Sequence, residues 1–433
     1  MKTIGKYAIE REIGRGAASK VYLATDTFSK QPVALKLLDL KGAGDANRIR
    51  IYRKLLAVEA SLAGKLSHPH IVKVLDAVLE GEVNYIVMEY VEGGTLEQYG
   101  EIDNLLPISS VAEVIYKCCK ALEFAAYQGV IHRDIKLANI LLLSGTDIKI
   151  SDFGAAALFA DQTTTLVSGV GSPAYMSPEQ VRETKLSHQT DIYSLGVVMY
   201  KLLTGRLPFD ASNNASLIYN ILNISPPPPS EYRPEISKGL DAIVLRAMEK
   251  DVVNRYQTWA EFSQDLVAFF GNVTPEEQKI FDTEKFDTLR SLAFFKNFSD
   301  VELWEVLRIS EWRKVAQDER ILRDGDEACS FYVIARGTVR VLKQGRLLSL
   351  LRRGDCFGEM AHLTEGEHRR STDVVSKTKV VLIEIQPDRL LRATTDCRFQ
   401  FNDAFLHLLV RRLSMANTRL SHLLADRASS EEE

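Results

Sequence analysis

The chain has 433 residues, of which 45% are hydrophobic and 26% charged, and its formal net charge at pH 7 is −4. One hydrophobic core rarely organises a chain of this length, so we expect two domains. The slightly acidic balance excludes the strongly basic surface that nucleic acid requires, and no apolar run approaches the roughly 18–20 residues of a membrane helix, so we expect no nucleic-acid or membrane partner.

The N-terminus and the cysteines indicate the compartment. The first residues, MKTIGKYAIE, lack the apolar core of a secretory signal. The five cysteines show neither the spacing of a metal site nor that of a disulfide framework. We therefore expect a cytoplasmic protein with reduced thiols.

The first two thirds of the chain predict a sheet lobe followed by a helical lobe. Residues 7–76 alternate between strand-like stretches and one helical segment, residues 45–66. From residue 111 to residue 270 the apolar spacing is mostly helical, with turns marked by glycines and by the run PPPP. We place the end of this domain at residue 271 and interpret the polar segment 272–290, expected to be helical without a strong apolar face, as a linker.

A different pattern begins at about residue 291. Short amphipathic helices precede short alternating strands, with turn signals at Asp324-Gly325-Asp326, Arg336-Gly337 and Gln344-Gly345. This pattern predicts a small, jelly-roll-like β-roll flanked by helices over residues 291–425, followed by an acidic tail at residues 426–433. The expected fold class of the whole chain is α+β.

Two glycines near the N-terminus lie between strand-like stretches. Gly14 and Gly16 would let a hairpin bring backbone N–H groups over phosphate oxygens. Ser19 stands where a third glycine would complete the motif. Taken alone, the motif leaves open a turn that binds no ligand.

Further along the chain, charged residues follow in an order that favours phosphoryl transfer. Lys36 lies on the next strand in Val-Ala-Leu-Lys, and Glu59 lies on the following helix, so an ion pair between them would hold the lysine toward phosphates. In HRDIKLAN and DFG, Asp134 suits a base that orients a hydroxyl, and Asn139 and Asp152 suit Mg²⁺ ligands.

These elements together resemble the eukaryotic-type (Hanks-type) serine/threonine protein kinase family over residues 7–271. The resemblance implies a two-lobed fold with ATP and Mg²⁺ between the lobes and protein substrates phosphorylated on Ser or Thr. It implies that Lys136 contacts the γ-phosphate and that Glu179 pairs with Arg255, while Asp191 anchors the catalytic loop. The ATP site that it implies also includes Gly14, Gly16, Val21, Ala34, Glu89, Val91 and Leu141, with Met88 as gatekeeper.

Two further features concern phosphorylation. Arg133 precedes the catalytic aspartate, and the activation loop contains Thr163, Thr164, Thr165 and Ser168, so we hypothesise autophosphorylation there; a merely polar loop is the alternative.

The stretch RRLS at 411–414 is either a basic phosphoacceptor motif or an ordinary helix with a basic face. Thr95 and Ala138 stand where basophilic relatives carry acidic residues, which favours the ordinary helix.

The C-terminal pattern contains a second recognisable motif. Alternating residues 331–341, the stretch GDCFGEMA and the pair Arg370-Ser371 resemble the cyclic nucleotide-binding domain family. The resemblance implies that Gly358 permits a turn from which the N–H groups of Met360 and Ala361 point at a phosphate. It assigns Glu359 to a ribose hydroxyl.

The phosphate ligand and the nucleotide remain open. The loop is longer than the usual family form, so either Arg369 or Arg370 could bind the phosphate; we favour Arg370, because Ser371 and Val374 then fall at family-like offsets. The ligand could be cAMP or cGMP, or the domain could have kept its fold for docking or dimerisation without a ligand. His407 and Leu409 are candidates for covering the base.

The combined prediction is an ATP-dependent serine/threonine protein kinase regulated by a cyclic nucleotide. The rival interpretation is a catalytically silent, nucleotide-binding scaffold. The complete set of charged residues described above argues against that rival. The sequence leaves the protein substrates and the oligomeric state open.

Overall fold

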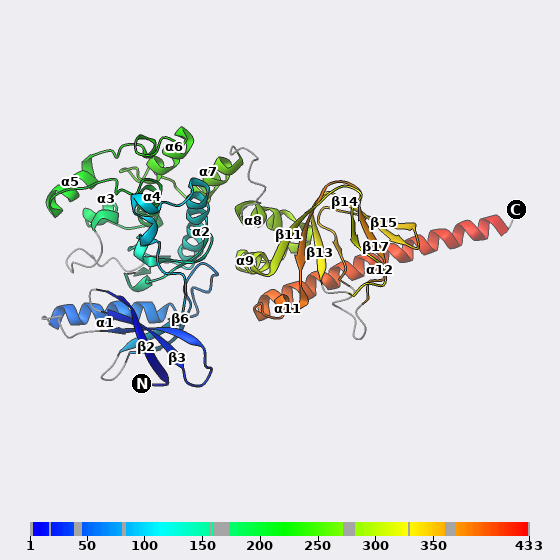
Figure 1. Cartoon of the computed structure of the whole chain (residues 1–433), viewed down its shortest axis with the longest axis horizontal. Coiled ribbons are helices and arrows are strands. Elements are labelled where there is room, and N and C mark those ends of the chain that lie inside the picture. The colour runs from blue at the N-terminus through cyan, green and yellow to red at the C-terminus, as the bar shows by residue number, and fades with distance from the viewer. Residues whose placement is uncertain are drawn as a thin grey trace. The chain divides into compact units, whose positions relative to one another are not determined.

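The chain forms two compact units, Met1–Gln278 (unit 1) and Lys279–Glu433 (unit 2), in the computed structural model drawn in Figure 1. The structure describes residues 3–16, 19–38, 46–79, 84–155, 157–158, 173–271, 282–327, 330–359 and 369–431. Each unit has its own apolar core.

Unit 1 begins with an antiparallel sheet that carries one helix. The strand order is β1-β2-β3-β4-β6-β5. Successive residues of a strand point to opposite faces, so Leu35 and Val87 pack on one face while Ala34 and Ile86 pack on the other, against Leu56 of the helix. The elements are β1 (Thr3–Ile4), β2 (Tyr7–Arg15), β3 (Ser19–Asp26), β4 (Pro32–Leu38), α1 (Ala46–Ser61), β5 (Val74–Val78) and β6 (Tyr85–Glu89).

The rest of unit 1 is a mostly helical lobe. Its central helix, α4, begins where Ser187 accepts a hydrogen bond from the N–H of Gln189 and ends at Gly205, whose φ of 72° closes the last turn. The elements are α2 (Ile108–Tyr127), β7 (Val130–Ile131), β8 (Ile140–Ser144), β9 (Asp147–Ile150), β10 (Ala157–Leu158), α3 (Pro178–Val181), α4 (His188–Thr204), α5 (Asn214–Asn223), α6 (Lys238–Ala247) and α7 (Trp259–Gly271). The segment between β7 and β8 contains the predicted catalytic loop.

Unit 2 is built on two antiparallel sheets with the orders β11-β18-β13-β16 and β12-β17-β14-β15. Inward-facing residues of both sheets form one apolar core, which includes Tyr332, Val339, Phe357 and Leu382. The strands are β11 (Ser310–Val315), β12 (Arg320–Leu322), β13 (Phe331–Arg336), β14 (Thr338–Lys343), β15 (Arg346–Arg352), β16 (Cys356–Phe357), β17 (Asp373–Ser376) and β18 (Val380–Ile385). The predicted α+β class is confirmed.

Helices flank this β-roll at both ends of its sequence. Phe286 is buried and stacks on Trp304 with ring centroids 4.6 Å apart, so residues 282–290 of the predicted linker pack into unit 2. The last helix reaches Glu431 and therefore contains most of the segment predicted as an acidic tail. The helices are α8 (Asp282–Ser291), α9 (Asp300–Ile309), α11 (Pro387–Leu390) and α12 (Thr395–Glu431).

Within the described residues, no helix has the length and apolar character that crossing a bilayer would demand. Cys118, Cys119, Cys356 and Cys397 are buried, free thiols, while Cys329 lies outside the described residues.

Candidate functional sites

Lys36 lies on β4 between two carboxylates. Its Nζ is 2.8 Å from Glu59 Oε2 on α1 and also contacts Asp152 Oδ1, just after β9. Burial acts to lower the pKa of Lys36, but the charges of Asp152 and Glu59 outweigh it and raise that pKa above its ordinary value. The structure thus holds a charged ammonium in place, where the sequence predicted a lysine that contacts phosphates.

The pKa values of the two carboxyls beside Lys36 shift in opposite directions. Burial raises the pKa of Glu59 above its usual value despite the nearby ammonium. Burial also acts to raise the pKa of Asp152, yet the charge of Lys36 prevails and lowers it. Asp152 therefore remains an ionised carboxylate, the form in which it can bind a cation.

The catalytic loop is held by hydrogen bonds from several elements. Asp134 Oδ2 is 2.7 Å from Lys136 Nζ and accepts a second bond from Asn139 Nδ2 at 3.2 Å. The backbone N–H groups of His132 and Arg133 donate to the two carboxylate oxygens of Asp191 at 2.7 and 2.8 Å. These bonds fix the direction of the Asp134 carboxylate.

A buried ion pair between Glu179 and Arg255 lies next to a residue that holds this loop. Arg255 donates through Nη1 to Glu179 Oε1 at 2.8 Å and through Nη2 to Glu179 Oε2 at 3.1 Å. Gln180, next to that glutamate, donates to the carbonyl oxygen of Arg133 at 2.9 Å. The predicted Glu179–Arg255 pair is present and acts as scaffold.

The oxygen groups near Lys36 fit a divalent cation. Asp152 offers a carboxylate. Asn139 donates through Nδ2 to both the carbonyl oxygen and Oδ2 of Asp134, which leaves its amide oxygen for a metal. Within the described ranges, no cluster of three or more His, Cys, Asp or Glu side chains could hold a metal by itself. Mg²⁺ suits such a sparse site, because it commonly takes its remaining ligands from water and substrate phosphates.

Apolar residues from separate strands form the predicted adenine site. Val21, Ala34, Val91 and Leu141 all belong to the cluster that contains Met88. Glu89 ends β6, and its side chain is bound by Lys149 Nζ at 2.6 Å, which fixes the segment that follows. The structure therefore brings together the residues that the kinase resemblance assigned to the base.

The glycine-rich turn is described in part. The N–H of Gly16 donates to Ser19 O at 2.8 Å, and a Cβ on Gly16 would lie 2.9 Å from Ser19 Oγ. Gly14 pairs with Val21 across the two strands. The activation-loop residues Thr163–Thr165 and Ser168, and Met360 and Ala361 in unit 2, lie outside the described residues, so the predictions made for them stand as predictions.

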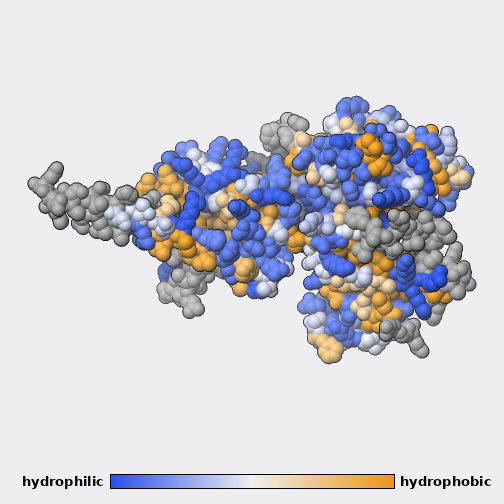
Figure 2. Space-filling view, turned by 180° about the vertical axis from the view of Figure 1, so that it is seen from behind, coloured by the Kyte–Doolittle hydropathy of each residue, from blue (hydrophilic) through white to orange (hydrophobic). Residues whose placement is uncertain are grey.

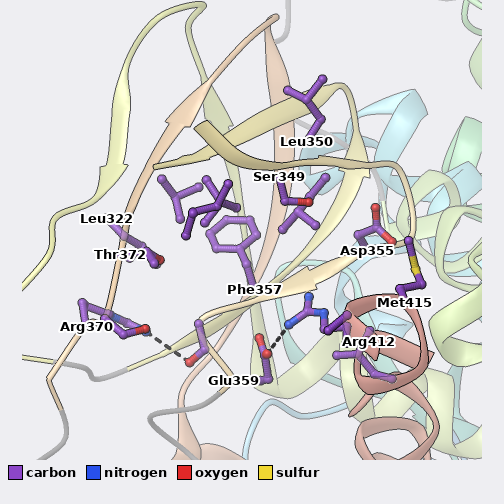
Figure 3. Close-up of a pocket in the computed structure, with 18 of the residues that line it drawn as sticks. Leu322, Ser349, Leu350, Asp355, Phe357, Glu359, Arg370, Thr372, Arg412 and Met415 are labelled. Carbon is purple, nitrogen blue, oxygen red and sulfur yellow. Dashed lines mark hydrogen bonds and ion pairs between the residues drawn. The ribbon is translucent and has the colours of Figure 1, made fainter. Parts of the chain in front are cut away.

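Unit 2 contains a pocket of about 650 Å³ at the edge of the β-roll. Figure 3 shows Phe357 at its floor, Arg370 on one side and residues of α12 on the other. A volume of this size is in the usual range for small-molecule sites. The lining residues from α12 are Leu408, Arg411, Arg412, Met415 and Ala416, so His407 and Leu409, named as candidates for covering the base, are not among them.

Arg370 and Arg369 both line this pocket but differ in burial. Arg370 is buried and donates through Nη1 to Gly358 O at 3.2 Å, whereas Arg369 is exposed and donates to Gly325 O at 3.2 Å. Gly358 has a φ of 81°, and a Cβ there would lie 2.8 Å from Arg370 Nη1. Ser371 also lines the pocket, with its carbonyl bound by Lys343 Nζ at 2.7 Å.

Glu359 has a partner that the sequence analysis missed. Its Oε1 is ion-paired with Arg412 Nη1 of α12 (Figure 3). The same guanidinium donates to Cys356 O. Glu359 is buried, and its Oε2 has no hydrogen-bond partner among the described residues. Nothing in the local sequence RRLS indicates that Arg412 reaches a residue 53 positions earlier in the chain.

Comparison with known families identifies two domains. The family described as "Protein kinase domain" matches residues 7–266, and the family described as "Cyclic nucleotide-binding domain" matches residues 312–396. The chain belongs to the protein kinase family, and its kinase domain is followed by a cyclic nucleotide-binding domain.

Curated relatives are similar over the first part of the chain. Serine/threonine-protein kinase PknB of Mycobacterium leprae is 38% identical over 281 residues, which cover 64% of this chain and 44% of the relative. PknB of Mycobacterium tuberculosis is 38% identical over 296 residues (66% and 47%), and PrkC of Bacillus subtilis is 35% identical over 294 residues (68% and 45%). The chain thus spans less than half the length of these relatives.

Proposed function

We propose that this protein transfers the γ-phosphoryl group of ATP to Ser or Thr hydroxyls of protein substrates. The observation that carries this proposal is the contact of Lys36 with both Glu59 and Asp152, because it joins the sheet lobe, α1 and the catalytic region in one charged cluster. The similarity to serine/threonine-protein kinases supports the same activity.

Each charged residue has a definite task in this proposal. Lys36 neutralises charge on the α- and β-phosphates, and Lys136 does so on the γ-phosphate. Asp134, already fixed by Lys136 and Asn139, accepts the proton of the substrate hydroxyl and orients its oxygen. When bound, Mg²⁺ at Asp152 and Asn139 supplies positive charge that offsets the charge on the phosphates.

The remaining predicted residues bind the nucleotide. Val21, Ala34 and Leu141 enclose the base, while backbone groups of Glu89 and Val91 form hydrogen bonds to its edge. Gly14 and Gly16 allow the turn to approach the phosphates without a Cβ in the way. The clustering of the apolar members around Met88 supports this assignment.

Measurement of ATP turnover separates this activity from the rival scaffold. The full chain is incubated with ATP, Mg²⁺ and a Ser/Thr-containing acceptor peptide, beside the variant Asp152→Ala. We expect turnover by the wild type and its loss in the variant, because the variant lacks a metal ligand. Equal, background-level signals from both proteins would support the scaffold and contradict the proposed activity.

We also propose that unit 2 binds a cyclic nucleotide that regulates the kinase. The supporting observation is the buried pair of opposite charges in the pocket: Arg370 for the cyclic phosphate and Glu359, with an unpartnered Oε2, for a ribose hydroxyl. Arg412 links this carboxylate to α12, so a ligand that engages Glu359 also changes the surroundings of that helix.

Regulation requires both binding and a response. Calorimetric titration of the full chain with cAMP and with cGMP identifies the preferred base, and kinase activity is then followed at saturating nucleotide. We expect activity to change in the wild type and not in Arg370→Gln. Nucleotide binding without any change in activity would contradict regulation, and the absence of binding by both nucleotides would contradict the proposed ligand class.

A further inference from the structure

Lys250 is a partly buried lysine of the helical lobe that the proposed catalysis does not use. Hydrophilic side chains predominate on the face of this lobe seen in Figure 2, as expected for charged groups that stay in water. Lys250, which follows α6, instead turns inward: its Nζ donates to the carbonyl oxygen of Ile221 in α5 at 2.7 Å and lies 3.4 Å from the hydroxyl of Tyr193 in α4. The same Nζ lies over the ring of Phe209, 4.0 Å from its centroid.

This amine lacks an anion to balance its charge. Glu179 is engaged by Arg255 through two hydrogen bonds, and the Arg255 guanidinium also lies over the Tyr193 ring, 5.1 Å from its centroid. Among the residues that the structure describes, no carboxylate is ion-paired with Lys250, whose partners are a carbonyl, a hydroxyl and aromatic rings. Burial and the charge of Arg255 lower the pKa of Lys250 to about 8. A large share of its amine is therefore neutral near pH 8, where an ordinary lysine is almost wholly protonated.

The groups that face this amine come from several elements. Besides Arg255, the charge of Arg182 at the end of α3 lowers the pKa of Lys250, and Glu249 beside it acts to raise that pKa. Burial raises the pKa of Tyr193, so its hydroxyl stays protonated and can donate to the neutral amine. Arg182 is exposed. The surroundings therefore favour a neutral amine and carry excess positive charge that attracts an anionic reagent.

We propose that Lys250 is a site of Nε-acylation by an acyl phosphate. Its partial exposure gives the reagent access, and its neutral amine is a nucleophile. The amine nitrogen attacks the acyl carbon, so a C–N amide bond forms and the C–O bond to the phosphate breaks. Inorganic phosphate leaves with the electron pair of that bond and takes up the proton released by the amine, so no oxidant or reductant is needed.

Acylation changes the contact between Lys250 and α5. The ammonium that bonds to Ile221 O is replaced by an uncharged amide, and the acyl group needs room beside the buried ring of Phe209. Helix α5 also packs against α3 and against the turn Pro173–Tyr175. We expect the amides of α5 to exchange hydrogen faster in the acylated chain than in the unmodified chain, and unchanged exchange would overturn this link to α5.

Labelling of the full chain with acetyl phosphate, followed by peptide mass spectrometry, tests the proposed site. At about pH 8 the neutral fraction of an amine with a pKa of about 8 is roughly a hundredfold that of an ordinary lysine, although a less basic amine is also a weaker nucleophile. We therefore expect Lys250 to be acetylated about tenfold faster or more than Lys238, whose side chain is 84% exposed. Equal rates for the two lysines would overturn the proposal.

The same reaction in concentrated urea is the control for the folded environment. Unfolding removes the contacts of Lys250 with α4 and α5, so Lys250 and Lys238 should then react at similar rates. A preference for Lys250 that persisted in urea would assign the reactivity to the local sequence and would overturn the proposal.

The variant Arg182→Gln tests the acyl donor. It should slow labelling by acetyl phosphate about fivefold more than labelling by an uncharged acetyl thioester, because only the phosphate is attracted by the guanidinium. Lys185→Gln, at an exposed position three residues away, is the matched control. Equal slowing with both donors would overturn the acyl phosphate as the reagent. None of these measurements depends on ATP turnover or on cyclic nucleotide binding, so this inference and the proposed function can fail separately.

Discussion

The catalytic cleft of unit 1, which is the site around Lys36, Glu59 and Asp152, and the pocket of unit 2 both hold paired opposite charges, but the two sites differ in where the charged residues come from. In the cleft, the partners Lys36, Glu59 and Asp152 all belong to motifs whose order along the chain already predicts the cluster. In the pocket, Glu359 lies in a recognisable motif, while its partner Arg412 comes from a long helix with no signature of its own.

This difference shows where control can enter. The cleft is organised by elements of one unit, because Lys36, Glu59 and Asp152 hold one another through ion pairs within that unit. The pocket places one of its charges on α12, because Arg412 of that helix pairs with Glu359. A ligand bound at Glu359 would therefore also act on α12.

Loss of the proposed base should have the largest effect. Asp134→Asn keeps a similar shape but cannot accept the substrate proton, so we expect phosphorylation of an acceptor peptide to slow by about 10²–10⁴-fold. Asp103→Asn, at an exposed position of the same lobe, is the control and should leave the rate unchanged. If Asp134→Asn were as fast as this control, Asp134 would not be the base.

The scaffold pair should show the next largest effect, on stability. Glu179→Gln leaves the fully buried guanidinium of Arg255 without its anion, so the free energy of unfolding should fall by about 3–5 kcal/mol at pH 7, measured by urea titration. Glu235→Gln removes the exposed partner of Arg233 and should cost less than about 1 kcal/mol.

The same pair predicts a dependence on pH. Burial acts to raise the pKa of Glu179, but Arg255 outweighs it and lowers that pKa below its usual value. Since the folded pKa lies below the unfolded value of about 4.3, the stabilisation is complete above that pH and is lost as the pH falls through the folded pKa. The stability gap between wild type and Glu179→Gln should therefore narrow below about pH 4; a constant gap would show that the carboxylate charge is not its source.

In the pocket, two neighbouring arginines provide a matched comparison. Arg370→Gln removes the buried charge proposed for the cyclic phosphate, and a charge-assisted hydrogen bond is worth about 1.5–3 kcal/mol, so affinity should fall roughly tenfold to a hundredfold. Arg369→Gln changes the exposed neighbour and should have little effect in the same calorimetric titration. The reverse order would assign the phosphate to Arg369.

The smallest effect concerns the contact between the pocket and α12. Arg412→Gln leaves Glu359 buried without a cation, so unit 2 should lose about 1–3 kcal/mol of stability, toward the lower end because the Arg412 side chain is 36% exposed. Arg411→Gln, one position away, is the control. Equal thermal unfolding of the two variants would mean that the Glu359–Arg412 pair does not hold α12 in place.

Most of the kinase fold and cleft could be predicted from the sequence. Lys36, Glu59, Asp134 and Asn139 lie in short motifs whose local strand, helix or loop already sets the direction of the side chain. Their order along the chain then defines one cluster. The C-terminal end of the predicted linker differs from the structure, because Phe286 and Leu289, which lie in the predicted linker, are buried in unit 2.

The motifs of the sequence name the candidate polar groups: the lysine, carboxylates and amide of the cleft, and the glutamate and two arginines of the pocket loop. The burial of Arg370 rather than Arg369, and the ion pair of Arg412 with Glu359, follow from the packing of the folded chain. A motif encodes local backbone geometry, whereas burial and long-range ion pairs depend on how a helix packs across a sheet.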